Sequence, residues 1–322
     1  MNILFINERT WPDYLADSVF HGLKQLSCNV HEFSDDTAWY MYDTEQSRNR
    51  WKEMFGNDKG SGFTLFHTLK KDRTISTDKK YRFLSIEDRI ENKYYDKIIY
   101  GTTWSSLPYL DEICSVYDKN DIIFLDGNDE EFNWYPRDDN GNEIEVKCNV
   151  YSVRNTTQGW VTDIGKVFKR EIPITFIGNV FPISIGFPEE LIVDKVPEKT
   201  QEWCPVTGTN FPNWVAVSDK KYGFGEQDLY YEEIQKSSYG FTMRKAGWDC
   251  MRHYEIIGNG TIPHFHELEK CPTKTLYNFP KELILKTNKK KPKDSYNDVV
   301  LELLDYMRNN LTTKKVAEYV LS

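Results

Sequence analysis

Charged residues with a distinctive spacing gather in one segment of the chain, Ser237 to Phe265. Within it, Arg252 and Glu255 are three residues apart and would share one face of a helix. A guanidinium can bind a phosphate through two parallel hydrogen bonds, and a carboxylate one turn further on can accept hydrogen bonds from the hydroxyl groups of a ribose. Spacing alone gives equal weight to a plain alternative, an exposed ion pair of little energetic value.

Two cations and two small residues stand ahead of this pair, because Arg244, Lys245, Ala246 and Gly247 follow the apolar run "YGFTM". Ligands of open α/β sheets bind outside the carboxyl ends of the strands, and the N-terminus of a helix favours an anion. We therefore expect Arg244, Lys245 and Gly247 to form part of a site for a diphosphate.

The same segment carries a family resemblance. "MRHYEIIGNGTIPHF" resembles the Arg-x-x-Glu-(six residues)-Pro segment of exostosin-like glycosyltransferases, a GT-B family, and "SSYGFTMRKAG" resembles the stretch before it. The similarity covers about residues 230–285, including "LYNFPKELI". It implies that Glu255 holds the ribose of a nucleoside-diphosphate sugar and Arg252 its diphosphate. The commoner GT-B pattern has a second glutamate eight residues earlier, where this chain has Gly247; this departure argues against the better-known retaining families.

Short apolar runs alternate with helical patterns along the chain, which predicts an α/β fold with parallel strands buried on both faces. The resemblance implies two Rossmann-like domains that face each other across a cleft. The charged stretch from Val193 to Trp203 offers the boundary, so we expect an N-terminal acceptor domain over residues 1–192 and a nucleotide-sugar-binding domain over residues 193–322, with the last helix packing back on the first domain. The strands are expected at residues 2–6, 29–33, 96–101, 121–127, 239–243 and 261–265, and helices at 14–26, 107–117, 226–238, around Arg252 and in a pair over 295–321.

The carboxyl ends of the predicted strands in the first half offer acceptor-side and catalytic candidates. Asn7, Glu8 and Asp13 follow the first strand, and Asp126 and Asp129 follow the apolar run of the fourth. An inverting transfer needs a base that takes the proton of the acceptor hydroxyl, and we favour Asp126 because it ends a strand that should be buried. Each of these side chains would also suit a helix cap or a loop anchor.

Lys169 and Arg170 lie in "FKRE", within a stretch that resembles a helix followed by apolar connections. They are candidates for contacting the phosphates of the donor, and a solvated helix end is the alternative. His253 is interpreted as a packed or rim residue rather than a catalytic base. His264 and His266 alternate along a predicted strand and could form a metal pair, but no carboxylate or cysteine pattern accompanies them, so a structural role is preferred.

Composition narrows the classes of function. The net charge of −9 argues against a nucleic-acid partner, although a local basic pocket is compatible with it. The 6 cysteines form no CxxC pair, so neither a zinc site nor a disulfide framework is expected. The amino terminus has no signal peptide or membrane span, which favours a cytoplasmic protein. No Asp-x-Asp triplet occurs, so we expect a metal-independent transfer without a cofactor, in which a UDP- or GDP-type sugar is the co-substrate and a glycan or another hydroxyl compound is the acceptor.

Three alternatives stay open. A sugar-nucleotide epimerase could use the same architecture. A non-catalytic carbohydrate-binding protein would use the aromatic side chains, which include 20 Tyr and 9 Trp. A glycoside hydrolase would need two paired carboxylates, and no feature of the sequence singles out such a pair.

Overall fold

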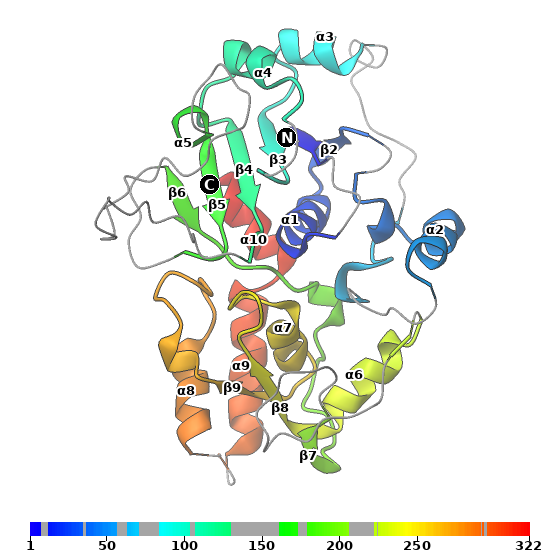
Figure 1. Cartoon of the computed structure of the whole chain (residues 1–322). Helices are drawn as coiled ribbons and strands as arrows, with labels where there is room; N and C mark the ends of the chain where they lie inside the picture. The colour runs from blue at the N-terminus through cyan, green and yellow to red at the C-terminus, as the bar shows by residue number, and fades with distance from the viewer. Residues whose placement is uncertain are drawn as a thin grey trace, which may run out of the picture.

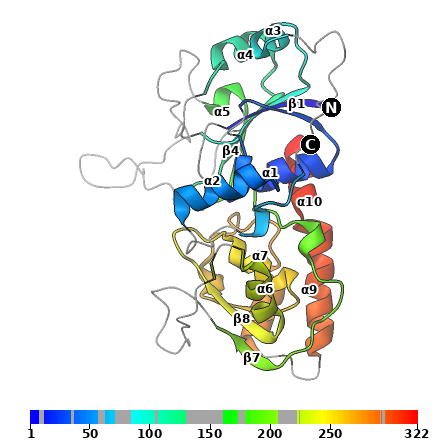
Figure 2. The same ribbon diagram turned by 90° about the vertical axis from the view of Figure 1, so that its right-hand side faces the viewer.

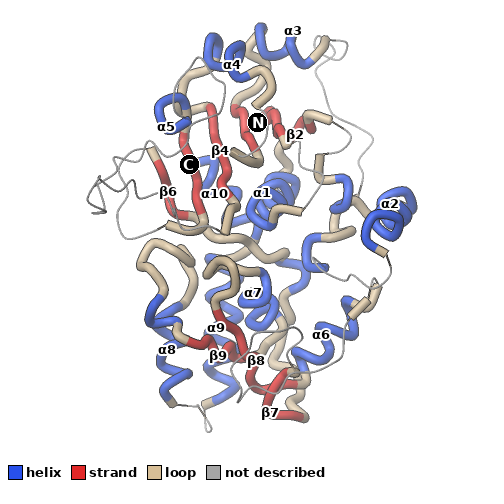
Figure 3. Tube along the Cα trace, in the orientation of Figure 1, coloured by secondary structure: helices blue, strands red, loops and turns tan. Residues whose placement is uncertain are grey.

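The computed structural model describes residues 1–7, 12–34, 37–56, 63–70, 84–103, 107–129, 161–172, 179–205, 222–223, 225–290, 292 and 295–322. These residues form two α/β lobes, each built on its own parallel sheet (Figures 1 and 3). The expected fold class, an α/β protein with two Rossmann-like domains, is confirmed.

The first lobe contains a sheet of 6 strands in the order β2-β1-β3-β4-β5-β6. Every neighbouring pair is parallel, so all the strands end at one edge of the sheet. Its strands consist mainly of buried apolar residues, which is typical of a sheet covered on both faces. The strands are β1 (Asn2–Ile6), β2 (Asn29–Glu32), β3 (Lys97–Tyr100), β4 (Ile122–Asp126), β5 (Lys166–Lys169) and β6 (Val180–Pro182), and the helices are α1 (Tyr14–Gln25), α2 (Glu45–Phe55), α3 (Ile86–Glu91), α4 (Leu110–Val116) and α5 (Val161–Ile164).

The second lobe has a smaller parallel sheet, in the order β7-β8-β9. The helix predicted around Arg252 is α7, which ends at Gly258 with Asn259 as its C-cap, and Gly260 follows in a left-handed conformation (φ +67°) as the Gly-Asn-Gly sequence predicts. The elements of this lobe are β7 (Gln201–Cys204), α6 (Gln227–Gln235), β8 (Ser237–Met243), α7 (Met251–Gly258), β9 (Ile262–His266), α8 (Lys281–Lys289) and α9 (Tyr296–Asn310).

The last helix, α10 (Thr313–Leu321), leaves the second lobe and packs against α1 of the first lobe (Figures 1 and 2). The two helices approach closely at Gly22, where an added Cβ atom would lie 2.0 Å from the carbonyl oxygen of Thr313. His21 Nδ1 and Thr313 Oγ1 are 2.8 Å apart in the same contact. Because one apolar core also includes residues from both lobes, the chain closes on itself and fixes how the lobes face each other.

The structure differs from the expected elements in three places. Residues 166–169 form a strand, whereas the sequence suggested that a helix runs through this region. Helix α7 begins at Met251, after a loop that contains Arg244 to Cys250. No helix was expected over residues 281–289, where helix α8 forms and includes the first four residues of the basic run that begins at Lys286. The predicted domain boundary, after Ile192, lies in the segment between the last strand of the first sheet and β7.

Candidate functional site

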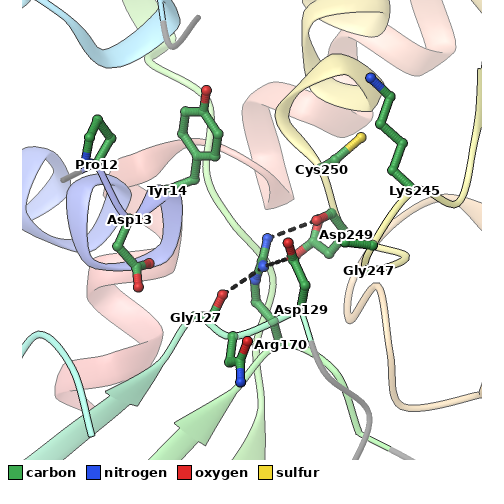
Figure 4. A pocket seen from close by; sticks show the side chains of 12 residues that line it. Pro12, Asp13, Tyr14, Gly127, Asp129, Arg170, Lys245, Gly247, Asp249 and Cys250 are labelled. Atoms are coloured by element: carbon green, nitrogen blue, oxygen red, sulfur yellow. Dashed lines mark hydrogen bonds and ion pairs between the residues drawn. The ribbon is translucent and has the colours of Figure 1, made fainter. Parts of the chain in front are cut away.

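A pocket of about 430 Å³ lies where the two lobes meet, a size within the range of small-molecule sites. The first lobe supplies the start of α1 and the residues that follow β4 and β5, and the second lobe supplies the loop between β8 and α7. Figure 4 shows Asp13 and Tyr14 on one side and Lys245 and Cys250 on the other, with Arg170 between them. The lining residues are Pro12, Asp13, Tyr14, Gly127, Asn128, Asp129, Arg170, Lys245, Ala246, Gly247, Asp249 and Cys250.

Arg170 connects the two walls of this pocket. Its guanidinium donates hydrogen bonds to the carbonyl oxygen of Gly127 (2.6 Å), to that of Asp249 in the second lobe (2.7 Å) and to the carboxylate of Asp129. Burial alone would lower the pKa of Arg170, but nearby carboxyl groups, Asp249 and Asp129 foremost, raise it above its ordinary value. Arg170 therefore carries its charge permanently. Its two terminal nitrogens make three hydrogen bonds to protein acceptors, and its buried Nε has no partner among the described residues.

Asp13 lies at the N-cap of α1 and also lines the pocket. Its Oδ1 accepts hydrogen bonds from the amides of Leu15 (3.0 Å) and Ala16 (3.3 Å), which fixes the side chain at the helix end. Gly127 leaves room for it, since a Cβ atom there would lie 2.1 Å from Asp13 Oδ1. The Asp13 carboxylate therefore both caps helix α1 and lines the pocket.

Glu171 is fully buried behind Gly247, which lines the pocket. Its Oε1 accepts the amide of Asp249 across the lobe interface (2.8 Å), while Oε2 has no hydrogen-bond partner among the described residues. Burial raises the pKa of Glu171 to about 7, and the amides of Asp249 and Trp248 offset only part of this increase. Near neutral pH this carboxyl group is therefore partly protonated.

Arg252 and Glu255 lie on α7, close to the lobe interface. Glu255 is buried, and its two oxygens accept hydrogen bonds from Thr64 Oγ1 of the first lobe (2.5 Å) and from Tyr230 Oη on α6 (2.6 Å). Tyr230, and after it Glu255, raise the pKa of Arg252. Burial raises the pKa of the Cys204 thiol, at the end of β7, and the charge of Arg252 acts against this increase. The pair is therefore part of a polar cluster at the carboxyl edge of the second sheet and does not point into bulk solvent.

Two pocket residues connect this cluster with the pocket. Burial and then the charge of Glu255 raise the pKa of Tyr14. Cys250, the N-cap of α7, supplies no side-chain hydrogen bond to the first turn of the helix. The pKa of its thiol rises to about 12 through burial, against the opposing charge of Arg252. The pocket, the N-terminus of α7 and the Glu255 cluster therefore adjoin one another.

Other predicted residues lie apart from the pocket. Arg244 lines a second hollow of about 260 Å³ with Trp248 and Lys270, and its guanidinium carbon lies 5.5 Å from the centre of the Trp248 ring. Asn7 follows β1 and is buried, and its carbonyl oxygen accepts a hydrogen bond from Thr37. Glu8 lies outside the described residues.

Asp126 and Lys169 form a fully buried ion pair on neighbouring strands. Asp126 Oδ2 and Lys169 Nζ are 2.8 Å apart, and the two side chains are 0% and 1% exposed. Asp126 Oδ1 also accepts the amide of Asn128 (3.0 Å). Neither side chain lines the pocket. The alternative placement of Lys169 on a solvated helix end is wrong, because the residue ends strand β5.

His253 is a packed residue, as interpreted. Its Nε2 lies 2.7 Å from the carbonyl oxygen of Trp248 and therefore donates, so Nδ1 accepts the hydroxyl of Thr242 at 2.8 Å. Burial lowers the pKa of His253 to about 3, which keeps the ring neutral. Within the described parts of the chain, no three His, Cys, Asp or Glu side chains are grouped in a way that could hold a metal ion.

The sequence did not point to four residues of this region: Thr64, Glu171, Tyr230 and Asp249. Asp129, a candidate from its place after the fourth predicted strand, does line the pocket. Glu171 directly follows the candidates Lys169 and Arg170, so the end of that strand held a signal for it. Thr64 and Tyr230 reach Glu255 only through the tertiary fold, and no local pattern announces them.

Comparisons with known proteins add little. No protein-family model matches the chain, and neither does any curated protein. Among solved structures, the chain is similar to the crystal structure of Acinetobacter baumannii MurG, with 9% sequence identity, a TM-score of 0.34 and coverage of 99% of each chain. A likeness at this level does not bear on the site or its substrate, and the exostosin-like resemblance of residues 230–285 stays a prediction.

Across the described residues, no helix has the length and apolar character needed to cross a lipid bilayer.

Proposed function

We propose that the protein is a glycosyltransferase that moves a sugar from a nucleoside diphosphate to an acceptor hydroxyl in the pocket between the lobes. The observation that carries the proposal is the setting of Glu255, whose two oxygens accept hydrogen bonds from two hydroxyl groups. The 2′- and 3′-hydroxyls of a ribose present the same pair of donors, so a ribose can replace the hydroxyls of Thr64 and Tyr230 when the donor binds.

The donor phosphates are assigned to the second-lobe side of the pocket. Lys245 is exposed in the loop ahead of α7, and Arg252 is in the first turn of that helix. The partial positive charge of a helix N-terminus adds to these two cations and favours an anion. In a metal-independent transfer the same groups would stabilise the diphosphate as it leaves with the electron pair of the broken bond to the sugar.

The acceptor is assigned to the first-lobe side. Its hydroxyl oxygen forms the new bond to the anomeric carbon, and its proton must go to a base. Asp13 suits this role because it is a carboxylate that lines the pocket. Asp126 remains the alternative, and its ion pair with Lys169 would have to open before it could accept the proton.

Calorimetric titration of UDP, GDP and their sugars into the full chain tests the donor site. We expect one nucleotide type to bind, and Arg252→Ala to weaken it by about 1.5–3 kcal/mol, the range for hydrogen bonds to charged groups. Glu255→Gln should weaken a nucleotide more than inorganic diphosphate, because only the nucleotide has a ribose. Lys315→Ala and Glu318→Gln, at an exposed ion pair on α10, are matched controls that should leave affinity unchanged.

The proposal would be contradicted if no nucleotide binds, or if neither Arg252→Ala nor Glu255→Gln changes the affinity for the nucleotide. If the sugar nucleotide is converted to an isomer without an added acceptor, the same site would belong to an epimerase.

A further inference from the structure

The pocket is electrically divided between the two lobes. Its first-lobe wall carries the carboxylates of Asp13 and Asp129, and the exposed cation, Lys245, is on the second-lobe wall (Figure 4). The second-lobe wall also contains Asp249, a buried carboxyl group whose pKa is raised by burial. A ligand that enters the pocket therefore meets the carboxylates of Asp13 and Asp129 on one side and the exposed cation of Lys245 on the other.

The buried cation of the first-lobe wall does not cancel this negative charge for a ligand. The terminal nitrogens of Arg170 donate to two backbone carbonyls and to Asp129. Four carboxyl groups, those of Asp249, Asp129, Asp13 and Glu171, are close enough to raise its pKa against the effect of burial. Asp249 belongs to the second lobe, and Glu171 is partly protonated near neutral pH. On the first-lobe wall the two carboxylates of Asp13 and Asp129 still outnumber the one guanidinium, so this wall favours hydrogen-bond donors over anions.

Asp129 has capacity left for a ligand. Its side chain is 46% exposed in the ion pair with Arg170, which engages Oδ1. Within the described part of the chain, Oδ2 accepts no hydrogen bond. A half-exposed carboxylate that a buried guanidinium holds in place is well suited to accept the hydroxyl of a bound sugar.

Glu171 supplies a second, independent observation at the same wall. Its fully buried carboxyl group has an oxygen without a hydrogen-bond partner among the described residues. A Cβ atom at pocket-lining residue 247 would lie 2.7 Å from Glu171 Oε1 and 2.9 Å from Asp129 Oδ1. Glycine at 247 therefore leaves room for two first-lobe carboxyl groups beside the pocket: Asp129 lines it, and Glu171 lies buried directly behind residue 247, with its Oε2 lacking a hydrogen-bond partner among the described residues.

We propose that the first-lobe wall formed by Asp13, Gly127, Asn128 and Asp129 binds an uncharged polyhydroxyl acceptor, such as a neutral sugar unit, and excludes acceptors that carry a phosphate or carboxylate on that unit. The proposal rests on the proposed glycosyl transfer, because it names the acceptor class of that site. Hydroxyl groups donate to the carboxylates of the wall, whereas an anionic group is repelled by them. The terminal nitrogens of Arg170 already donate to protein acceptors, and its Nε, which has no partner among the described residues, is buried.

Saturation-transfer NMR on the full chain tests this class. The probes are the methyl glycosides of glucose, galactose and mannose, the corresponding 6-phosphates, glucuronic acid and glucosamine, each without nucleotide and again with UDP or GDP. We expect at least one neutral glycoside to bind and the phosphates and glucuronic acid to bind at least about tenfold more weakly. Asp129→Asn should weaken the neutral glycoside about tenfold and narrow its advantage over the phosphates. Asp118→Asn, at an exposed aspartate of the same lobe, is the matched control.

Because Asp129→Asn also removes the ion-pair partner of Arg170, a second variant tests the wall without changing that pair. Gly127→Ala adds a Cβ atom against Asp13, and it should weaken the same glycoside while the thermal unfolding curve reports whether the fold is intact. Equal or tighter binding of the phosphates, a preference for glucosamine, or no binding of any neutral glycoside would overturn the proposal. If the protein binds a neutral glycoside but no nucleotide, the sugar-binding role of this wall would be supported and the proposed glycosyl transfer would be refuted.

Discussion

The buried carboxyl group of Glu171 should make the stability of this protein depend on pH in a defined direction. Its pKa in the folded protein is about 7, against an ordinary value of 4.5. Between these two values the unfolded chain has lost the proton that the folded chain still holds, so the free energy of unfolding falls as pH rises through this window. The difference corresponds to at most about 3 kcal/mol, and it is complete above pH 7.

Glu171→Gln isolates this effect, because glutamine keeps an oxygen to accept the Asp249 amide but does not titrate. Its amide N–H groups lack an acceptor where Oε2 now lies, which costs about 1–3 kcal/mol at every pH. Two buried histidines, His31 and His253, have pKa values lowered to about 4 and about 3 by burial, and they act in the opposite direction. The informative quantity is therefore the difference in unfolding free energy between variant and wild type as a function of pH.

Urea unfolding followed by tryptophan fluorescence at pH values from 5 to 8 measures that difference. From pH 5 to pH 8, we expect the unfolding free energy of the variant to rise relative to that of the wild type by about 2–3 kcal/mol. Glu302→Gln, at an exposed position of α9, should show no such trend. A difference between Glu171→Gln and wild type that stays constant from pH 5 to 8 would refute the assignment of a raised pKa to Glu171.

Three further outcomes follow from contacts in the structure. Lys169→Met leaves a carboxylate fully buried without its partner and should cost about 3–5 kcal/mol in urea unfolding, with recovery when Asp126→Asn is added; equal stability of single and double variants would contradict this. Gly22→Ala places a Cβ atom against the backbone of α10 and should lower the thermal midpoint by several degrees, at a cost of about 1–3 kcal/mol; an unchanged midpoint would show that the helices separate without cost. Tyr230→Phe removes a hydrogen bond to Glu255, so it should destabilise the unliganded protein by about 1 kcal/mol and strengthen nucleotide binding in calorimetry, since no hydroxyl is left to displace; weaker binding would place Tyr230 in direct contact with the nucleotide.

The order of strands and helices could be predicted where apolar runs are long and turn residues frame them. The runs at residues 2–6 and 121–127 contain β1 and β4, and the pattern around Arg252 gives α7. Strand β5 was missed because it has four residues, two of them lysines at its ends. Asp126 on the next strand neutralises the buried Lys169, and such a partner across a sheet leaves no trace in local sequence.

The site could be predicted only in part for a related reason. Local spacing pointed to Lys245, Arg252 and Glu255, which lie in the loop and helix that follow one strand. The contacts around these residues come from distant parts of the chain. Thr64 is 191 residues from its partner Glu255 in the sequence, and Arg170 is 79 residues from Asp249, whose backbone it contacts. Packing of the two lobes creates these contacts, and only the folded chain reveals them.

A crystal structure of the full chain with UDP or GDP bound would be the sharpest test of the proposed donor site. We expect the diphosphate beside Lys245 and the first turn of α7, with the ribose hydroxyls on the Glu255 carboxylate in place of Thr64 and Tyr230. A nucleotide bound elsewhere, for example with its diphosphate in the hollow beside Arg244 and Lys270 and its ribose away from Glu255, would contradict the assignment of the donor site.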